Sequence, residues 1–180
     1  MRHFSGRHEF QWLAKSLRRM HFAAMMFRQP DYECRRLSDW LRTPVVTLKA
    51  GAKISFYTTA TLNTTFANDL QVYISLNGSS TNVGSNAQTP TGGDFGLLTN
   101  GDLNPTLSVN GYPQGWTQFT FTLTSAQVAA ATSGRIGLRY YIPDTTTQGS
   151  AIGLDTFSFT PAVATNFTAS TSGNWNDPTL

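Results

Sequence analysis

The chain has 180 residues, of which 39% are hydrophobic and 13% are charged, and this length and composition indicate one domain with its own hydrophobic core. Its net charge of +3 arises in residues 1–36, where eight Lys and Arg face three acidic residues, whereas residues 37–180 carry five against seven. The positive net charge therefore does not indicate that residues 37–180 bind nucleic acid. No run reaches the roughly 20 apolar residues of a membrane-spanning helix, and residues 21–27 lack the cleavage site of a signal peptide.

Residues 1–37 form a basic head whose residue usage differs from the rest, because all four Met, all three His, the only Cys and both Glu lie there. Apolar residues recur at spacings of three and four, as on one face of a helix, at Phe10, Leu13, Leu17, Met20 and Ala24. One interpretation is a basic amphipathic helix that binds a membrane or a partner. The other, which we favour, is a segment that is foreign to the domain or disordered.

Strand patterns dominate the remainder, and the longest is the stretch 115–124. Four residues fall on one side of an extended chain there, Thr117, Phe119, Phe121 and Leu123. Similar patterns predict further strands at residues 45–48, 53–58, 69–77, 94–98, 103–109, 134–142 and 151–159. Residues 125–131 are expected to form one or two helical turns with Ser125 as N-cap. Short strands separated by turn signals predict an all-β fold, an antiparallel two-sheet sandwich over residues 38–160.

The residue inventory of 37–180 excludes most catalytic chemistry. Without His it cannot build a Ser-His-Asp triad, and without Cys it has neither a thiolate nucleophile nor a zinc thiolate site. Its seven Asp are scattered without the paired spacing of a glycosidase, and it has no Glu. The single Cys of the head cannot form an internal disulfide. We therefore expect the protein not to be an enzyme.

Eight short motifs occur in one order along the predicted sandwich, at Ser38–Pro44, Ile54–Tyr57, Asp69–Ser75, Asp94–Phe95, Gly111–Pro113, Trp116–Phe119, Gly137–Tyr141 and Gly153–Asp155. Together they resemble the choice-of-anchor J domain, a relative of the cleaved adhesin domain of bacterial secreted proteins. The resemblance implies a jelly-roll sandwich of the concanavalin-like type. It also implies a noncatalytic, monomeric module of a larger bacterial secreted or cell-surface protein, located outside the cell, which serves adhesion or binding or acts as a spacer.

The chain departs from the family's pattern at both ends. The family usually has a β-rich segment where this chain has its basic head, so a first strand is expected to be missing and a sheet edge to be unpaired. Residues 161–180 are expected to be a linker and the truncated start of a further module, because residues 173–178 resemble the opening of such a module. We therefore expect the chain to be a fragment of a longer protein.

Asp155 is the candidate metal ligand, because it interrupts an apolar run and a carboxylate in such a place needs a partner. One hypothesis is a structural Ca²⁺ ion, which related sandwich modules often hold and which prefers oxygen ligands. The alternative is a carboxylate that accepts backbone N–H bonds or pairs with Arg139. No other cofactor is expected.

Carbohydrate binding would use exposed aromatic side chains beside polar ones. Four aromatic residues lie off the main buried face by alternation, Tyr57, Tyr73, Trp116 and Tyr141. They are the candidate binding residues, and the alternative is that they cover the rim of the sandwich. The expected partner is a glycan or a host or cell-surface protein, and not a nucleic acid. The alternative function is a carbohydrate-binding module attached to an extracellular hydrolase.

Overall fold

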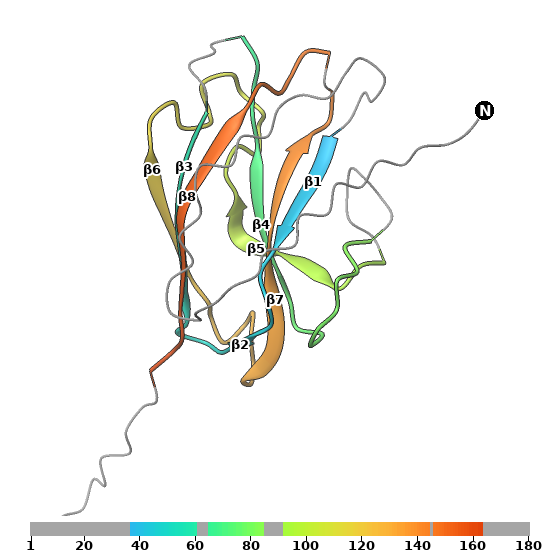
Figure 1. Cartoon of the computed structure of the whole chain (residues 1–180), viewed down its shortest axis with the longest axis vertical. Helices are drawn as coiled ribbons and strands as arrows, with labels where there is room; N and C mark the ends of the chain where they lie inside the picture. The colour runs from blue at the N-terminus through green and yellow to red at the C-terminus, as the bar shows by residue number, and fades with distance from the viewer. Residues whose placement is uncertain (1–36, 61–64, 85–91, 145, 164–180) are drawn as a thin grey trace, which may run out of the picture.

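The structure is a computed structural model that describes residues 37–60, 65–84, 92–144 and 146–163. The predicted head and most of the predicted C-terminal linker lie outside these residues. Eight strands are found in the described part: β1 (Leu37–Arg42), β2 (Val46–Leu48), β3 (Lys53–Ala60), β4 (Leu70–Ser75), β5 (Phe95–Asp102), β6 (Thr117–Thr122), β7 (Thr132–Ile142) and β8 (Ile152–Thr160) (Figure 1). In the same residues, no helix has the length and apolar character needed to cross a membrane.

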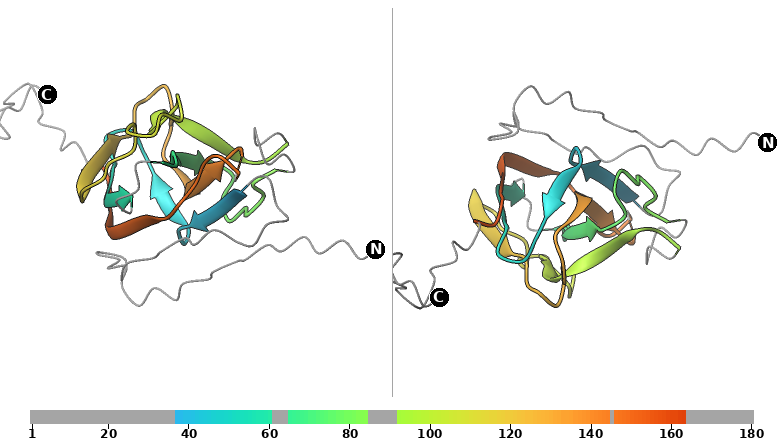
Figure 2. Two further views of the ribbon diagram at one scale, coloured as in Figure 1. Left: turned by 90° about the horizontal axis from the view of Figure 1, so that it is seen from above. Right: turned by 90° about the horizontal axis from the view of Figure 1, so that it is seen from below.

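The strands form two antiparallel sheets, which confirms the predicted all-β sandwich. The larger sheet has the order β1-β7-β4-β5, with β2 also paired to β7, and the smaller sheet has the order β6-β3-β8. Views from above and below show the two sheets facing one another (Figure 2). The chain crosses between the sheets after β2, β3, β5, β6 and β7, so each sheet combines strands that are distant in sequence.

The core lies between the two sheets and is built by alternation along the strands. Ile136, Leu138 and Tyr140 of β7 point into it, as do Ile54 and Phe56 of β3, and all are buried. The predicted inward side of 115–124 is also correct. Phe119 and Phe121 stack on the Phe56 ring with centroids 6.1 and 6.2 Å away, but both are only half-buried because β6 is an edge strand.

Three local predictions differ from the structure. Strand β1 was not predicted, although it pairs with β7 along its whole length. The predicted strand at 103–109 is wrong, because Asn104 holds this segment as a turn through its bonds with Ser108. The predicted helical turns at 125–131 reduce to one turn, in which Val128 N donates to Thr124 O at 2.9 Å.

Candidate functional site

The structure divides the four candidate aromatic residues between two faces. Tyr73 and Tyr141 lie on the outer face of the five-stranded sheet, on β4 and β7. Tyr57 lies on the outer face of the three-stranded sheet, and Trp116 lies over the same face directly before β6. The four residues therefore do not form one surface.

The outer face of the five-stranded sheet is closed by its own side chains. Trp40 packs against Tyr73 and Phe95, with ring centroids 4.8 and 5.7 Å apart, and Tyr73 is only 5% exposed. A Cβ on Gly137, beneath these rings, would come within 3.1 Å of both Trp40 and Phe95. The rings thus rest directly on the β7 backbone, and Trp40 is a packing residue.

Arg139 continues this closed layer and is only 1% exposed. Its guanidinium carbon lies 4.1 Å from the Tyr141 ring centroid and 5.8 Å from that of Trp40. Arg139 Nε donates to Ser38 Oγ at 2.8 Å, and Nη1 donates to Gln71 Oε1 at 3.0 Å. Cation–π contacts and hydrogen bonds together account for the burial of this cation. Tyr141 is therefore engaged within the fold.

An acid pair lies on the same sheet and was missed by the sequence analysis. The carboxyl groups of Asp69 and Asp102 hydrogen bond to one another, and Asn104 N–H points to Oδ1 of both at 3.2 Å. Gln71 Nε2 also donates to Asp102 Oδ2 at 2.8 Å. Burial, with the charge of Asp102 and the hydrogen bond to it, raises the pKa of Asp69 to about 8. The Asn104 N–H and the Arg139 cation oppose this rise.

Two buried tyrosines are also committed to structure. Tyr140 Oη donates to Asn68 Oδ1 at 2.7 Å, and the Tyr112 hydroxyl lies 2.5 Å from Thr58 Oγ1. Burial raises the pKa of both phenols above the ordinary value, so both stay neutral at physiological pH. These groups satisfy buried hydrogen bonds and are not poised to transfer protons near neutral pH.

The outer face of the three-stranded sheet is different, because a large ring lies open on it. Trp116 is 51% exposed. Its six-membered ring crosses the sheet to β8, where a Cβ on Gly153 would come within 2.9 Å of Cη2 and 3.4 Å of Cζ2. Thr59, paired with Gly153, borders the same spot. The missing side chain of Gly153 thus lets the indole lie on the sheet.

Polar side chains form the next row on this face. The strand registers align Gln118 of β6 with Tyr57 of β3, and Tyr57 with Asp155 of β8. All three therefore point to the same side as the Trp116 indole. An amide, a phenol and a carboxylate thus lie across three strands, one row away from an exposed indole.

A β-bulge explains why Asp155 lies within an apolar run. The pairing of β3 with β8 shifts between Ser55 and Tyr57, and Thr156 has a positive φ of 51°. Asp155 and Thr156 both reach the surface as a result, and Phe157 returns to the core. Asp155 Oδ1 accepts the Thr156 N–H at 2.6 Å, which is the backbone bond that one hypothesis expected.

The calcium site at Asp155 stays a prediction. No group of three His, Cys, Asp or Glu side chains that could hold a metal ion occurs among the described residues. Asp155 supplies one carboxylate, and Ca²⁺ takes six to eight oxygen ligands. Arg139, the other partner considered, belongs to the outer face of the opposite sheet.

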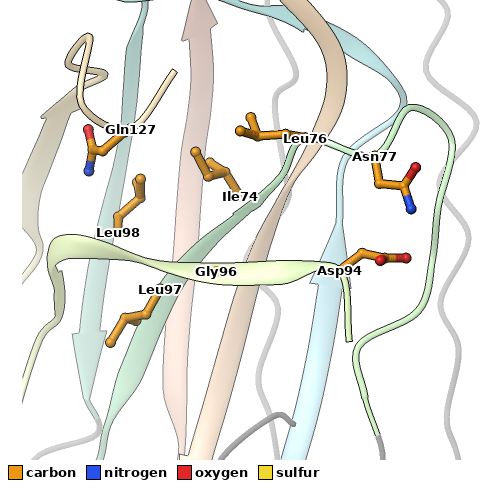
Figure 3. Close-up of a pocket in the computed structure, with 8 residues that line it drawn as sticks. All are labelled: Ile74, Leu76, Asn77, Asp94, Gly96, Leu97, Leu98 and Gln127. Atoms are coloured by element: carbon orange, nitrogen blue, oxygen red, sulfur yellow. The ribbon is translucent and has the colours of Figure 1, made fainter. Parts of the chain in front are cut away.

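Two connected pockets lie at the edge of the sandwich. The first, of about 560 Å³, has aliphatic walls from β4, β5 and the residues beside them, with a few polar side chains at its ends (Figure 3). Hydrogen bonds from Ser80 and Asn77 lower the pKa of Asp94, one of these polar residues. The second, of about 490 Å³, shares Leu98 and Gln127 with the first and reaches β6. The first pocket therefore lies beside β4 and β5, and the second lies between the edge strands β5 and β6.

Comparisons with known proteins give only distant likenesses. No family model matches the chain, and no curated protein matches it. A cleaved adhesin domain of Lys-gingipain from Porphyromonas gingivalis is 21% identical with a TM-score of 0.38, and the match covers 68% of this chain and 63% of that chain. A second cleaved adhesin domain of Lys-gingipain is 18% identical with a TM-score of 0.42, with the same coverage. The chain thus spans less than two thirds of these structures, which are of the class that its sequence motifs resemble.

Proposed function

We propose that residues 38–160 are a noncatalytic recognition module of a larger secreted or cell-surface protein, and that the outer face of β6, β3 and β8 contacts the partner. One observation carries the proposal: the Trp116 indole is half-exposed and lies on Gly153, on a face that is otherwise polar. Scattered small apolar residues are normal on a surface, but exposed aromatic rings are enriched where proteins bind their partners.

The chemistry of the chain supports a noncatalytic role. Residues 37–180 contain no His, Cys or Glu, and the Asp69–Asp102 pair is engaged in hydrogen bonds with Asn104 and Gln71. The motifs that resemble choice-of-anchor J domains support a place in a secreted or surface protein. A carbohydrate-binding module attached to an extracellular hydrolase is the alternative, and it would use the same face.

Retention on surfaces tests the proposal. The labelled full chain is applied to intact bacterial cells, intact animal cells and mucin-coated plates, beside Trp116→Ala and Leu97→Ala. Leu97 is 48% exposed on the other sheet and is the matched control. We expect retention of the wild type and of Leu97→Ala, and a loss of at least tenfold with Trp116→Ala, whose thermal unfolding stays close to that of the wild type. No retention of the wild type on any surface, or equal retention of all three proteins, would overturn the proposal.

A further inference from the structure

We infer that the partner of this face is a neutral glycan, whose sugar ring stacks on the Trp116 indole while its hydroxyl groups bond to Gln118, Tyr57 and Asp155. This inference rests on the proposed recognition role of the face and names the class of ligand. Its basis is the pairing of one open aromatic plane with an adjoining polar row, which the strand registers fix.

The indole supplies a flat apolar plane in a fixed position. Atoms Cη2 and Cζ2 of its six-membered ring lie over Gly153 of β8, and the residue is 51% exposed. A sugar ring has a face of C–H groups that can cover such a plane, and an aromatic ring that is already immobilised loses little conformational entropy on binding. The contact with Gly153 therefore restricts the orientation of the Trp116 indole before a ligand binds.

The polar row offers what sugar hydroxyl groups need. Each hydroxyl both donates and accepts, and Gln118 and Tyr57 likewise have groups of both kinds, whereas the Asp155 carboxylate only accepts. Oδ1 of Asp155 is held by the Thr156 N–H, which fixes the carboxylate on the surface. Neighbouring strands lie about 4.8 Å apart, so the three groups span about 10 Å across the sheet.

The charge on the face favours a neutral ligand over an acidic one. Among the described residues aligned in these two rows, the only ionised side chain is Asp155. Lys53 lies at the far end of β3, paired with Thr122 and Thr160. An acidic polysaccharide would approach a carboxylate without a nearby cation, which is unfavourable. Neither pocket includes a residue of these two rows, so the glycan would bind on the surface of the sheet.

Gly153→Ala provides a direct test of how the indole is positioned. The added Cβ would lie 2.9 Å from Trp116 Cη2, at the outer end of an exposed side chain, so the indole moves and the fold persists. Trp116 is retained in this variant, but its plane is displaced. Binding through the ordered plane should therefore fall, while thermal unfolding stays close to that of the wild type.

Affinity electrophoresis of the full chain tests the inference, with gels containing hydroxyethyl cellulose, galactomannan, soluble starch or the acidic polygalacturonate. We expect retardation by at least one neutral polymer, whereas any retardation by polygalacturonate should be equal in Trp116→Ala, because the basic residues 1–36 attract an acidic polymer independently of this face. Trp116→Ala and Gly153→Ala should each weaken retardation by the neutral polymer at least tenfold, Asp155→Asn should weaken it severalfold, and Leu97→Ala should leave it unchanged. Retardation by a neutral polymer that persists in Trp116→Ala, or retardation by polygalacturonate and by no neutral polymer, would overturn the inference.

The surface-retention assay separates failure of this inference from failure of the proposed function. Oxidation of the coated surface by periodate, which cleaves the vicinal diols of sugars, should abolish retention if the ligand is a glycan. Retention that depends on Trp116 but survives periodate would identify another partner, such as a protein. The recognition role would then stand and the glycan would be excluded. Absence of retention on every untreated surface would instead remove the proposed function itself.

Discussion

Asp69 and Asp102 hydrogen bond through their carboxyl groups on the outer face of the five-stranded sheet, although the two residues belong to different parts of the chain. Two ionised carboxylates in contact repel one another, and Asp69 is only 1% exposed to solvent. One carboxyl group of the pair therefore keeps its proton at pH values well above those at which an aspartate ordinarily ionises, and the pKa of Asp69 is raised to about 8. At pH values below this pKa, Asp69 is therefore protonated in the folded protein.

The first prediction concerns the pH dependence of stability. In the unfolded chain Asp69 loses its proton near pH 4, whereas in the folded chain it keeps the proton to about pH 8. Between these pH values the folded state therefore binds more protons than the unfolded state. The contribution of Asp69 to the free energy of unfolding falls as the pH rises, by up to about 1.4 kcal/mol per pH unit. Asp69→Asn removes this dependence. In urea unfolding, the free energy of unfolding of the variant minus that of the wild type should therefore be about 1–3 kcal/mol larger at pH 8 than at pH 5.

Asp94→Asn is the matched control. Hydrogen bonds from Ser80 and Asn77 lower the pKa of Asp94, so it is ionised in both states across that pH range. Its difference from the wild type should be the same at pH 5 and pH 8. An equally constant difference for Asp69→Asn would show that the acid pair does not hold a proton at neutral pH.

The second prediction concerns the aromatic layer. Gly137→Ala would place a Cβ 3.1 Å from both Trp40 and Phe95, whose rings are packed on other side chains. We expect a loss of about 1–2 kcal/mol in the free energy of unfolding, because the added methyl forces the rings apart. Gly96→Ala is the control, since nothing lies within 4 Å of its Cβ position on β5. Equal effects of the two substitutions would contradict this account of the layer.

Every strand except β1 could be predicted from the sequence, including β4, whose side chains are buried on both faces. In β3 the buried and half-exposed residues alternate, so its pattern is clear. In β1 the Trp40 ring packs within the outer layer while Leu41 enters the core, so apolar residues are adjacent and the alternation is lost. The prediction of a strand at 103–109 failed for another reason. The spacing of apolar residues there is that of a strand, but Asn104 hydrogen bonds within a turn.

The candidate site could be predicted only in part. Alternation correctly placed Tyr57 and Trp116 away from the core, but which residues share a surface depends on strand order. The seat of Trp116 on Gly153 links β6 with β8 across β3, and no sequence spacing encodes that contact. The Asp69–Asp102 pair was missed for the same reason, since β4 and β5 meet through an irregular register.

The third prediction concerns the bulge that presents Asp155. Thr156 is β-branched and has a φ of 51°, a left-handed conformation that costs a non-glycine residue about 1–2 kcal/mol. Thr156→Gly removes this strain but adds freedom to the unfolded chain, so we expect a net gain of up to about 1 kcal/mol. Ser158→Gly, on the same strand and paired with Ser55, should instead lose about 0.5–1 kcal/mol. A similar loss in both variants on thermal unfolding would show that Thr156 is not strained.

The fourth prediction concerns Arg139. Its guanidinium donates to Ser38 and Gln71 at once and lies over the Tyr141 ring, and a lysine ammonium cannot reproduce this planar arrangement. Arg139→Lys keeps the charge, yet we expect a loss of about 1–3 kcal/mol in urea unfolding, because buried hydrogen-bonding groups lose their donors.

Arg42→Lys is the control for this substitution, because Arg42 lies on β1 near the surface and donates to the Thr81 carbonyl at 2.5 Å in an exposed bond. A change of no more than about 0.5 kcal/mol is expected there, since exposed polar substitutions have small effects. If both variants change equally little, charge alone keeps Arg139 in place. If only Arg139→Lys is destabilised, the fork of donors and the stack on Tyr141 hold the outer layer of the five-stranded sheet closed.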